Sequence, residues 1–161
     1  MLLLALITGQ RRADLAEMKL SDIKGRHLFV EQQKTGAKIA IPLSLRMRCI
    51  NTSLAEVIDS CRSYGAPSDY MLHKSNGAPL SPDSLSARFE TVREKSLGLW
   101  AEKGTPPSLH ECRALAAWLY QEQGDVDIVQ LLGHMDSKMT ATYLGRRSRE
   151  ERAWRFVSTN Q

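Results

Sequence analysis

The sequence predicts a mostly helical α+β domain that carries one small antiparallel sheet. Three observations lead to this fold class: several segments have the apolar periodicity of helices, two β-prone runs are joined by a short turn, and the length of 161 residues suits one compact domain. Apolar residues make up 42% of the chain and charged residues 25%, an ordinary composition for a folded domain. No internal repeat or long linker divides the chain, so we expect a single domain over residues 1–161.

Two helices are predicted at the N-terminus. The apolar run over residues 1–7 is far shorter than the roughly 20 residues that a bilayer span requires, so we interpret it as the last turns of a buried helix, ended by Gly9. It also lacks the basic region and cleavage site of a signal peptide. Residues 13–23 predict a second helix, whose inner face begins at Leu15.

A β-hairpin is predicted next. The β-prone segments 27–33 and 38–43 are separated by residues 34–37, in which Gly36 supplies the conformational freedom that a tight turn needs. Pro42 closes the second strand, because proline has no N–H to donate to a sheet.

Five further helices are predicted downstream. Serine before proline at 81–82 is typical of a helix start, and the serine and glutamate at 108 and 111 have the spacing of a capping box. The segment 63–79 is rich in Gly, Pro and Ser, so we expect a loop with one strand at most. The predicted helices cover residues 45–61, 82–96, 108–123, 125–133 and 138–144.

Charge and cysteine content limit the classes of function only loosely. The formal charge of +4, from 22 basic and 18 acidic residues, suits a polyanionic partner without establishing one. The cysteines Cys49, Cys61 and Cys112 form no CxxC pair, so neither a zinc site nor a disulfide framework is well supported. We expect buried thiols in a reducing cytoplasm, and no metal.

Four polar residues in the C-terminal half are of interest, although each has an ordinary explanation. His110 and Arg113 lie three residues apart near a predicted helix N-terminus, which favours a phosphate, but such pairs are usually plain surface residues. His134 follows the helix end at Gly133 and can help to satisfy its last carbonyls. Tyr143 would normally be half-buried packing.

The combination is far more specific than its parts. Four motifs follow one another over nearly the whole chain. They are TGQR with Asp14 and Leu15, VEQQKTGAKIAIP, HECRALAAWLY and LLGHMDSKMTATY. Arg11 and Lys34 are 23 residues apart, His110 and Arg113 three, and His134 and Tyr143 nine. In this order and at these spacings, the motifs resemble the phage-integrase family of tyrosine recombinases, most closely its lambdoid branch.

The resemblance implies a fold and a set of site residues. The fold would be that of the tyrosine-recombinase catalytic domain, of the DNA breaking–rejoining type. Arg11, Arg113 and His134 would contact the scissile phosphate, and Tyr143 would be the nucleophile. The complete set of implied catalytic and supporting residues, in chain order, is Arg11, Asp14, Lys34, His110, Arg113, His134 and Tyr143.

Elementary chemistry agrees with these roles. A phosphodiester resists attack because it is anionic and its leaving alkoxide is poor. The planar guanidiniums of Arg11 and Arg113 can hold its non-bridging oxygens bidentately and stabilise the pentacoordinate transition state, and His134 can donate a further hydrogen bond. Concentrated positive charge also favours the phenolate form of Tyr143, the reactive form of the nucleophile.

The remaining implied residues handle protons or give support. His110 can accept or return the phenol proton, and Lys34, on the hairpin tip, can protonate the departing 5′ oxygen. Asp14 matches an acidic position that supports the first arginine. The product would be a 3′-phosphotyrosine, which stores the bond energy until a second DNA end attacks, so no metal, ATP or other cofactor is expected.

The resemblance also implies partners and a setting. The reaction would be site-specific recombination that integrates or excises phage or prophage DNA, in the cytoplasm of a bacterial host and associated with its nucleoid. Expected partners are double-stranded attachment sites, a homotetramer assembled on DNA, accessory DNA-bending proteins and an excisionase, with no membrane. The chain is too short for the family's usual N-terminal core-binding domain, so we expect the catalytic domain of a longer integrase.

Two alternatives remain open. A type IB topoisomerase uses a similar Arg, Lys, His and Tyr set, although the Leu-Gly-His turn nine residues before the tyrosine favours a recombinase. A non-catalytic DNA-binding remnant would have no need for all six residues. A Ser/His hydrolase is set aside because the chain has no GxSxG elbow.

Residues 146–161 are expected to form a C-terminal tail. Its first part is a basic run, by default a solvated face and otherwise a contact to the DNA backbone. In related integrases a short strand after the tyrosine packs on a sheet and gates the tyrosine. Trp154 and Phe156 would be costly to expose together, so we expect this segment to dock as a strand or an extended segment and to restrain Tyr143 when DNA is absent.

Overall fold

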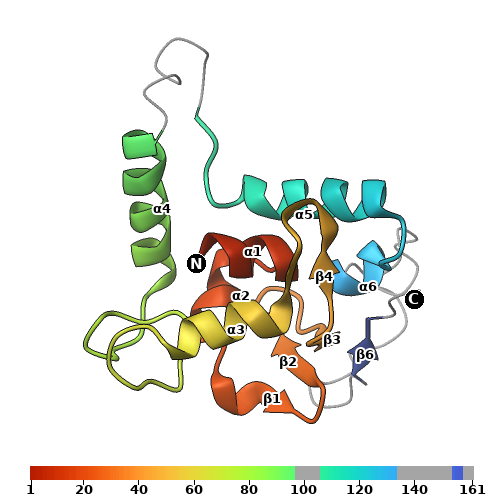
Figure 1. Ribbon diagram of the computed structural model, residues 1–161, viewed down its shortest axis with the longest axis horizontal. Coiled ribbons are helices and arrows are strands. Elements are labelled where there is room, and N and C mark those ends of the chain that lie inside the picture. The colour runs from red at the N-terminus through yellow and green to blue at the C-terminus, as the bar shows by residue number, and fades with distance from the viewer. Residues whose placement is uncertain (97–105, 134–153, 158–161) are drawn as a thin grey trace.

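The computed structural model describes residues 1–96, 106–133 and 154–157 (Figure 1). Over these residues the fold is mostly helical with small sheets, which confirms the predicted fold class. The helices are α1 (Leu2–Thr8), α2 (Arg12–Glu17), the 3-10 helices η1 (Leu20–Asp22) and η2 (Arg48–Ile50), α3 (Leu54–Arg62), α4 (Pro82–Ser96), α5 (Glu111–Gln123) and α6 (Ile128–Leu132). The strands are β1 (Ile23–Lys24), β2 (His27–Glu31), β3 (Lys38–Pro42), β4 (Arg46–Met47), β5 (Thr52–Ser53) and β6 (Arg155–Phe156).

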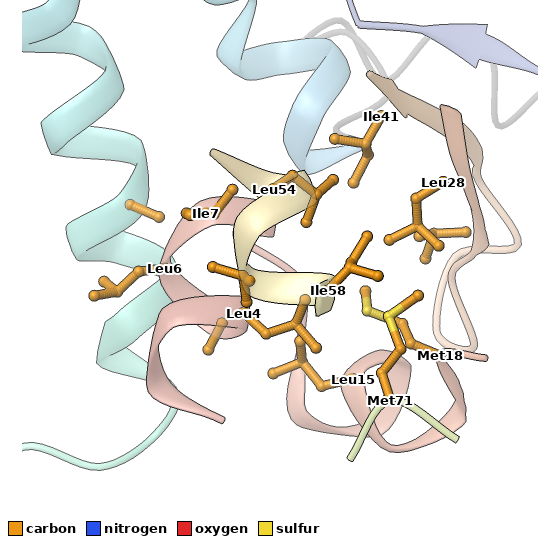
Figure 2. Close-up of a cluster of buried hydrophobic side chains, with 14 of the residues drawn as sticks. Leu4, Leu6, Ile7, Leu15, Met18, Leu28, Ile41, Leu54, Ile58 and Met71 are labelled. Carbon is orange, nitrogen blue, oxygen red and sulfur yellow. The ribbon is translucent and has the colours of Figure 1, made fainter. Parts of the chain in front are cut away.

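Helix α1 lies at the centre of the domain, between α3 and α5 (Figure 1). Its residues 4–8 are all buried, which confirms the buried helix predicted there, although Leu2 and Leu3 at its start are exposed. Side chains from α1, α2, α3 and the β2–β3 hairpin converge on one core (Figure 2). The labelled members of this core are Leu4, Leu6, Ile7, Leu15, Met18, Leu28, Ile41, Leu54, Ile58 and Met71.

The predicted hairpin is confirmed. Strands β2 and β3 pair antiparallel, with His27 opposite Pro42 and Glu31 opposite Lys38. The turn between them closes through a bond from the Gly36 N–H to the Gln32 carbonyl (2.7 Å), and Gly36 has a left-handed backbone (φ 62°) that favours glycine.

The main sheet is mixed rather than purely antiparallel. Its strand order is β1-β2-β3-β6, and β6 runs parallel to β3. A parallel neighbour needs a long connection instead of a tight turn, and more than a hundred residues separate these two strands. The predicted docking of the tail as a strand is thus confirmed for Arg155–Phe156. The expected burial of Trp154 and Phe156 is wrong, because they remain 38% and 53% exposed on the face of the sheet that carries Phe29. Trp154 meets Phe29 edge-on (ring centroids 4.8 Å apart), and the Val157 N–H donates to the Ala40 carbonyl (3.0 Å).

The helix predicted over residues 13–23 is wrong in its second half. Helix α2 ends at Glu17, and Met18 is extended (ψ 128°). The loop that contains Asp69 draws the next residues away, because the Asp69 carboxylate accepts both the N–H (2.9 Å) and the hydroxyl (2.7 Å) of Ser21. Long-range hydrogen bonds therefore override the helical periodicity.

The helix predicted over residues 45–61 is also wrong in its first half. Strands β4 and β5 form a small hairpin there, and Asn51 takes a left-handed conformation at its tip (φ 47°). Arg46 ties the tip down, since its Nη1 donates to the Asn51 carbonyl (2.7 Å). The helix begins only at Leu54, where Ser53 and Glu56 form a reciprocal capping box.

The later helices agree better with the sequence. Helix α4 has the predicted bounds, and the Ser81 hydroxyl accepts the Ser84 N–H at its start (3.2 Å). Helix α5 begins at Glu111, three residues after the predicted start, and ends before Gly124 as expected. Helix α6 is capped by Asp127 rather than opened at Asp125. The helix predicted over 138–144 lies outside the described residues.

The loop at residues 63–79 agrees with its prediction, and the cysteines agree in part. The segment 63–79 is a loop whose only pairings are isolated bridges. Cys61 and Cys112 are buried free thiols, whereas Cys49 is exposed, contrary to the expected burial of all three. In the part of the chain that the structure describes, no helix has the length and apolarity needed to cross a bilayer.

Candidate active site

Arg113 is buried between two helix ends. It lies in the first turn of α5 and is 7% exposed. Its Nη1 donates to the carbonyl of Gly9 (2.8 Å), which caps α1, and its Nη2 donates to the carbonyl of Leu132 (2.6 Å), the last residue of α6. Carbonyls at helix C-termini lack partners within the helix, so they suit a cationic donor.

The surroundings of Arg113 lower its pKa but leave the side chain positively charged. Burial and the like charge of Arg11 together lower the pKa of Arg113 to about 10, and the charge of Asp14 opposes both. A pKa of about 10 leaves the guanidinium protonated at neutral pH. The site therefore holds two arginines whose charges repel, an arrangement that an anion placed between them would stabilise.

Arg11 lies at the junction between α1 and α2. It has an extended backbone (ψ 156°) as the N-cap of α2, and its side chain is partly buried. Its Nη1 donates to Oε1 of Gln32 (2.9 Å), which anchors one side of the guanidinium to the base of the β2–β3 turn.

Asp14 lies in the first turn of α2 and is almost fully buried. Its Oδ1 accepts the backbone N–H of Gln33 (2.7 Å), so the carboxylate binds the hairpin rather than Arg11. Its Oδ2 has no hydrogen-bond partner among the described residues. Its charge acts on Arg113, whose protonated form it favours.

Lys34 and His110 are both exposed. Lys34 lies on the β2–β3 turn, as the hairpin prediction requires. His110 precedes α5, where the Ser108 hydroxyl accepts its N–H (3.2 Å) and Glu111 accepts the Ser108 N–H (2.7 Å). His110 and Arg113 thus share one helix start but differ in burial.

Sequence reasoning missed two buried glutamines that connect these parts. Gln10 is 3% exposed and Gln32 is fully buried, and Nε2 of Gln32 donates to Oε1 of Gln10 (2.7 Å). Gln10 in turn donates to the carbonyl of Leu131 (2.7 Å). A signal for Gln32 was present: it continues the inward phase of Leu28 and Val30 along the strand, so the alternation predicts burial of a polar amide.

Two glycines allow the close packing of this region. A Cβ on Gly9 would lie 2.9 Å from the Leu132 side chain, and a Cβ on Gly133 would lie 2.9 Å from Oε1 of Gln32. Both glycines also have left-handed backbones. The glycines of the Thr-Gly-Gln-Arg and Leu-Gly-His motifs therefore have a packing reason as well as a conformational one.

The two remaining site predictions, His134 and Tyr143, lie outside the described residues. Tyr120, expected to be core packing, is fully buried and donates its hydroxyl to the Ile7 carbonyl (2.9 Å). Burial raises the pKa of the Tyr120 phenol, which disfavours the phenolate that a nucleophile requires. Among the described residues, no group of three or more His, Cys, Asp or Glu side chains could hold a metal ion.

Comparisons with known proteins relate this arrangement to a family. The integrase of Escherichia phage HK022 is 45% identical over 148 residues, which cover 91% of this chain and 41% of the relative. The solved structure of the lambda integrase catalytic core matches with a TM-score of 0.74 and 40% identity, over 83% of this chain and 80% of that one. The fold is therefore the one that the sequence resemblance implied.

A lambda integrase tetramer bound to a Holliday junction matches with a TM-score of 0.77 and 38% identity, over 95% of this chain and 42% of that one. The chain spans about two fifths of the length of the curated relatives it matches. The family model described as the phage integrase family matches residues 1–150. This chain therefore belongs to the phage integrase family.

Proposed function

We propose that residues 1–161 act as the catalytic domain of a site-specific DNA recombinase, which cleaves and rejoins DNA strands to integrate or excise phage or prophage DNA. The observation that carries this proposal is that Arg11, bonded to Gln32 at the base of the turn that bears Lys34, lies near enough to the buried Arg113 for their charges to interact. Two neighbouring guanidiniums repel each other, and an anion bound by both, such as a phosphodiester, offsets this repulsion.

The reaction would proceed through a covalent 3′-phosphotyrosine. Arg11, Arg113 and His134 would bind the scissile phosphate, and Tyr143 would attack it. His110, exposed at the start of α5, would accept or return the phenol proton, and Lys34 would protonate the 5′ oxygen as it leaves. Asp14 would support the arginines through its charge.

No metal or ATP would be required. The arginines supply the positive charge that stabilises the transition state, and the phosphotyrosine keeps the energy of the broken phosphodiester for the rejoining step. The tyrosine thus leaves as the second DNA end attacks, and the enzyme returns to its starting state.

The proposed partners follow from the relatives. Because a lambda integrase tetramer binds a Holliday junction, we propose that this chain assembles as a homotetramer on double-stranded attachment sites. Accessory DNA-bending proteins and an excisionase would direct the reaction, within the bacterial cytoplasm. The docked strand β6 is consistent with a tail that restrains Tyr143 until DNA is bound.

A covalent-adduct assay tests this function. The chain is incubated with nicked duplexes whose half-sites are randomised, so that cleavage releases a short strand and traps the protein on DNA. We expect adducts enriched in one half-site sequence, lost in Tyr143→Phe and retained in Tyr120→Phe.

Three results would contradict the proposal: no adduct on any sequence, adducts without sequence preference, or loss of the adduct in Tyr120→Phe alone. Adducts without sequence preference and without strand exchange would indicate a topoisomerase. Binding without any adduct would indicate a DNA-binding remnant.

A further inference from the structure

Gln32 makes every hydrogen bond that its side chain can make. An amide oxygen accepts two bonds and an amide nitrogen donates two. Oε1 of Gln32 accepts from Arg11 (2.9 Å) and from the Thr35 hydroxyl (2.8 Å). Nε2 donates to Oε1 of Gln10 (2.7 Å) and to the Leu132 carbonyl (3.0 Å). The side chain is fully buried, so water does not compete for these bonds.

These four bonds reach three separate segments of the candidate site. Arg11 and Gln10 belong to the segment between α1 and α2, Thr35 to the turn that bears Lys34, and Leu132 to the end of α6, two residues before His134. The Leu132 carbonyl also accepts from Arg113, so one oxygen links the buried arginine to the same amide.

The backbone of Gln32 holds the turn as well. Its N–H donates to the Ala37 carbonyl (2.9 Å), and its carbonyl accepts the Gly36 N–H (2.7 Å). The backbone thus closes the turn on one side, while the side chain fixes the guanidinium of Arg11 on the other. A shift of Gln32 would move the turn and the guanidinium together.

An apolar side chain would be the ordinary choice at this position, because it lies in the buried phase of the strand. A buried amide costs free energy unless every polar atom is paired, and the full pairing here meets that condition. The identity of the residue is therefore explained by what it binds rather than by core packing.

We propose that Gln32 is a positioning residue for the cleavage reaction, which acts by orienting the guanidinium of Arg11. The proposal deepens the proposed function and rests on it. Gln32 does not itself contact the phosphate; it acts through the guanidinium that does.

A double-mutant cycle distinguishes this role from a general contribution to folding. Gln32→Met keeps an unbranched side chain of similar length but removes all four bonds. We expect the rate of adduct formation at saturating protein to fall on the order of 100-fold, the scale of a small misplacement of a catalytic group. DNA affinity should change far less. In an Arg11→Lys background the same change should reduce the rate by no more than about twofold, because the group that Gln32 orients is already absent.

Two further variants serve as controls. Gln121→Met makes the same substitution at an exposed position of α5 and should leave the rate unchanged. Gln32→Glu keeps an oxygen that accepts from Arg11 but loses the donors to Gln10 and Leu132. If Gln32→Met does not fold, Gln32→Glu replaces it, and it should retain clearly more activity than the Arg11→Lys variant.

A measurement without DNA separates failure of this proposal from failure of the proposed function. The Nη hydrogens of Arg11, assigned by their loss in Arg11→Lys, should exchange slowly with solvent in the unmodified chain, remain slow in Gln32→Glu and become fast in Gln32→Met. Equal fold-losses in both Arg11 backgrounds would overturn the positioning role, as would unchanged exchange in Gln32→Met. If the unmodified chain formed no adduct, the proposed function would fail and the exchange experiment alone would decide the role of Gln32.

Discussion

Replacing Gly133 by alanine should destabilise the domain much more than replacing Gly124 by alanine. Both glycines end helices with a left-handed backbone, at φ 61° and 79°. A Cβ on Gly124 would meet nothing within 4 Å, whereas a Cβ on Gly133 would lie 2.9 Å from Oε1 of Gln32 and 2.9 Å from Cδ1 of Ile39. The pair therefore separates backbone strain from packing.

The magnitudes follow from the two contributions. Left-handed backbone costs a residue with a Cβ about 1–2 kcal/mol, which is the full effect expected for Gly124→Ala. Overpacking a tight site adds about 1–3 kcal/mol, so Gly133→Ala should lose about 2–5 kcal/mol in total. Gln32 cannot move aside cheaply, because all four bonds of its amide would be disturbed.

Urea denaturation followed by far-UV circular dichroism measures the free energy of unfolding of both variants. Equal losses for the two variants would refute the close approach of Gly133 to Gln32. A second check uses the adduct assay: Gly133→Ala should cleave more slowly than Gly124→Ala under conditions in which both are folded.

Three other predictions follow from the same contacts. Arg113→Lys should reduce the rate of cleavage about 100-fold or more, because an ammonium cannot bind the Gly9 and Leu132 carbonyls and still present a planar fork to phosphate. A near-normal single-turnover rate would contradict this prediction. Truncation after Gly145 removes the docked strand β6, so it should raise non-productive cleavage of nicked duplexes and impair tetrameric recombination. A truncated chain that cleaves and recombines like the full one would exclude gating by the tail. Tyr120→Phe should change how stability depends on alkaline pH. Burial raises the phenol pKa above its usual value of 10.0, so above about pH 10 the unfolded state loses a proton that the folded state keeps. The free energy of unfolding of the unmodified chain therefore falls above about pH 10. The phenylalanine variant should lack this part of the fall in urea titrations, and an unchanged pH dependence would contradict the buried phenol.

The sequence predicted the elements whose signals lie within a few neighbouring residues. The hairpin was predictable because a glycine-containing turn lies between two β-prone runs, and α4 because serine and proline mark its start. The early end of α2 was not, since it depends on Asp69, a residue 48 positions from Ser21. The apolar pattern that predicts a helix over residues 45–61 also covers the β4–β5 hairpin, and only the capping-box spacing of Ser53 and Glu56 marks the true start of α3.

In the candidate site, too, residues in local motifs were predictable and residues defined by long-range contacts were not. Sequence motifs predicted Arg11, Lys34, His110 and Arg113. The structure brings the charges of Arg11 and Arg113 together, and it leaves Lys34 exposed on the β2–β3 turn and His110 exposed before α5. Motifs gave no role to Gln32, because its importance arises from bonds to residues 22 and 100 positions away. Such a residue becomes visible only when the chain has folded.

The central claim is that Tyr143 attacks the scissile phosphate and becomes joined to the 3′ end of the cleaved strand. The most direct test isolates the covalent adduct formed on a nicked duplex, digests the protein and maps the modified peptide by mass spectrometry, with end-labelling to show which DNA end is attached. The account predicts one modified residue, Tyr143, linked to a 3′ phosphate, with a free 5′ hydroxyl on the released strand. Modification of any other residue, or attachment to a 5′ phosphate, would contradict it.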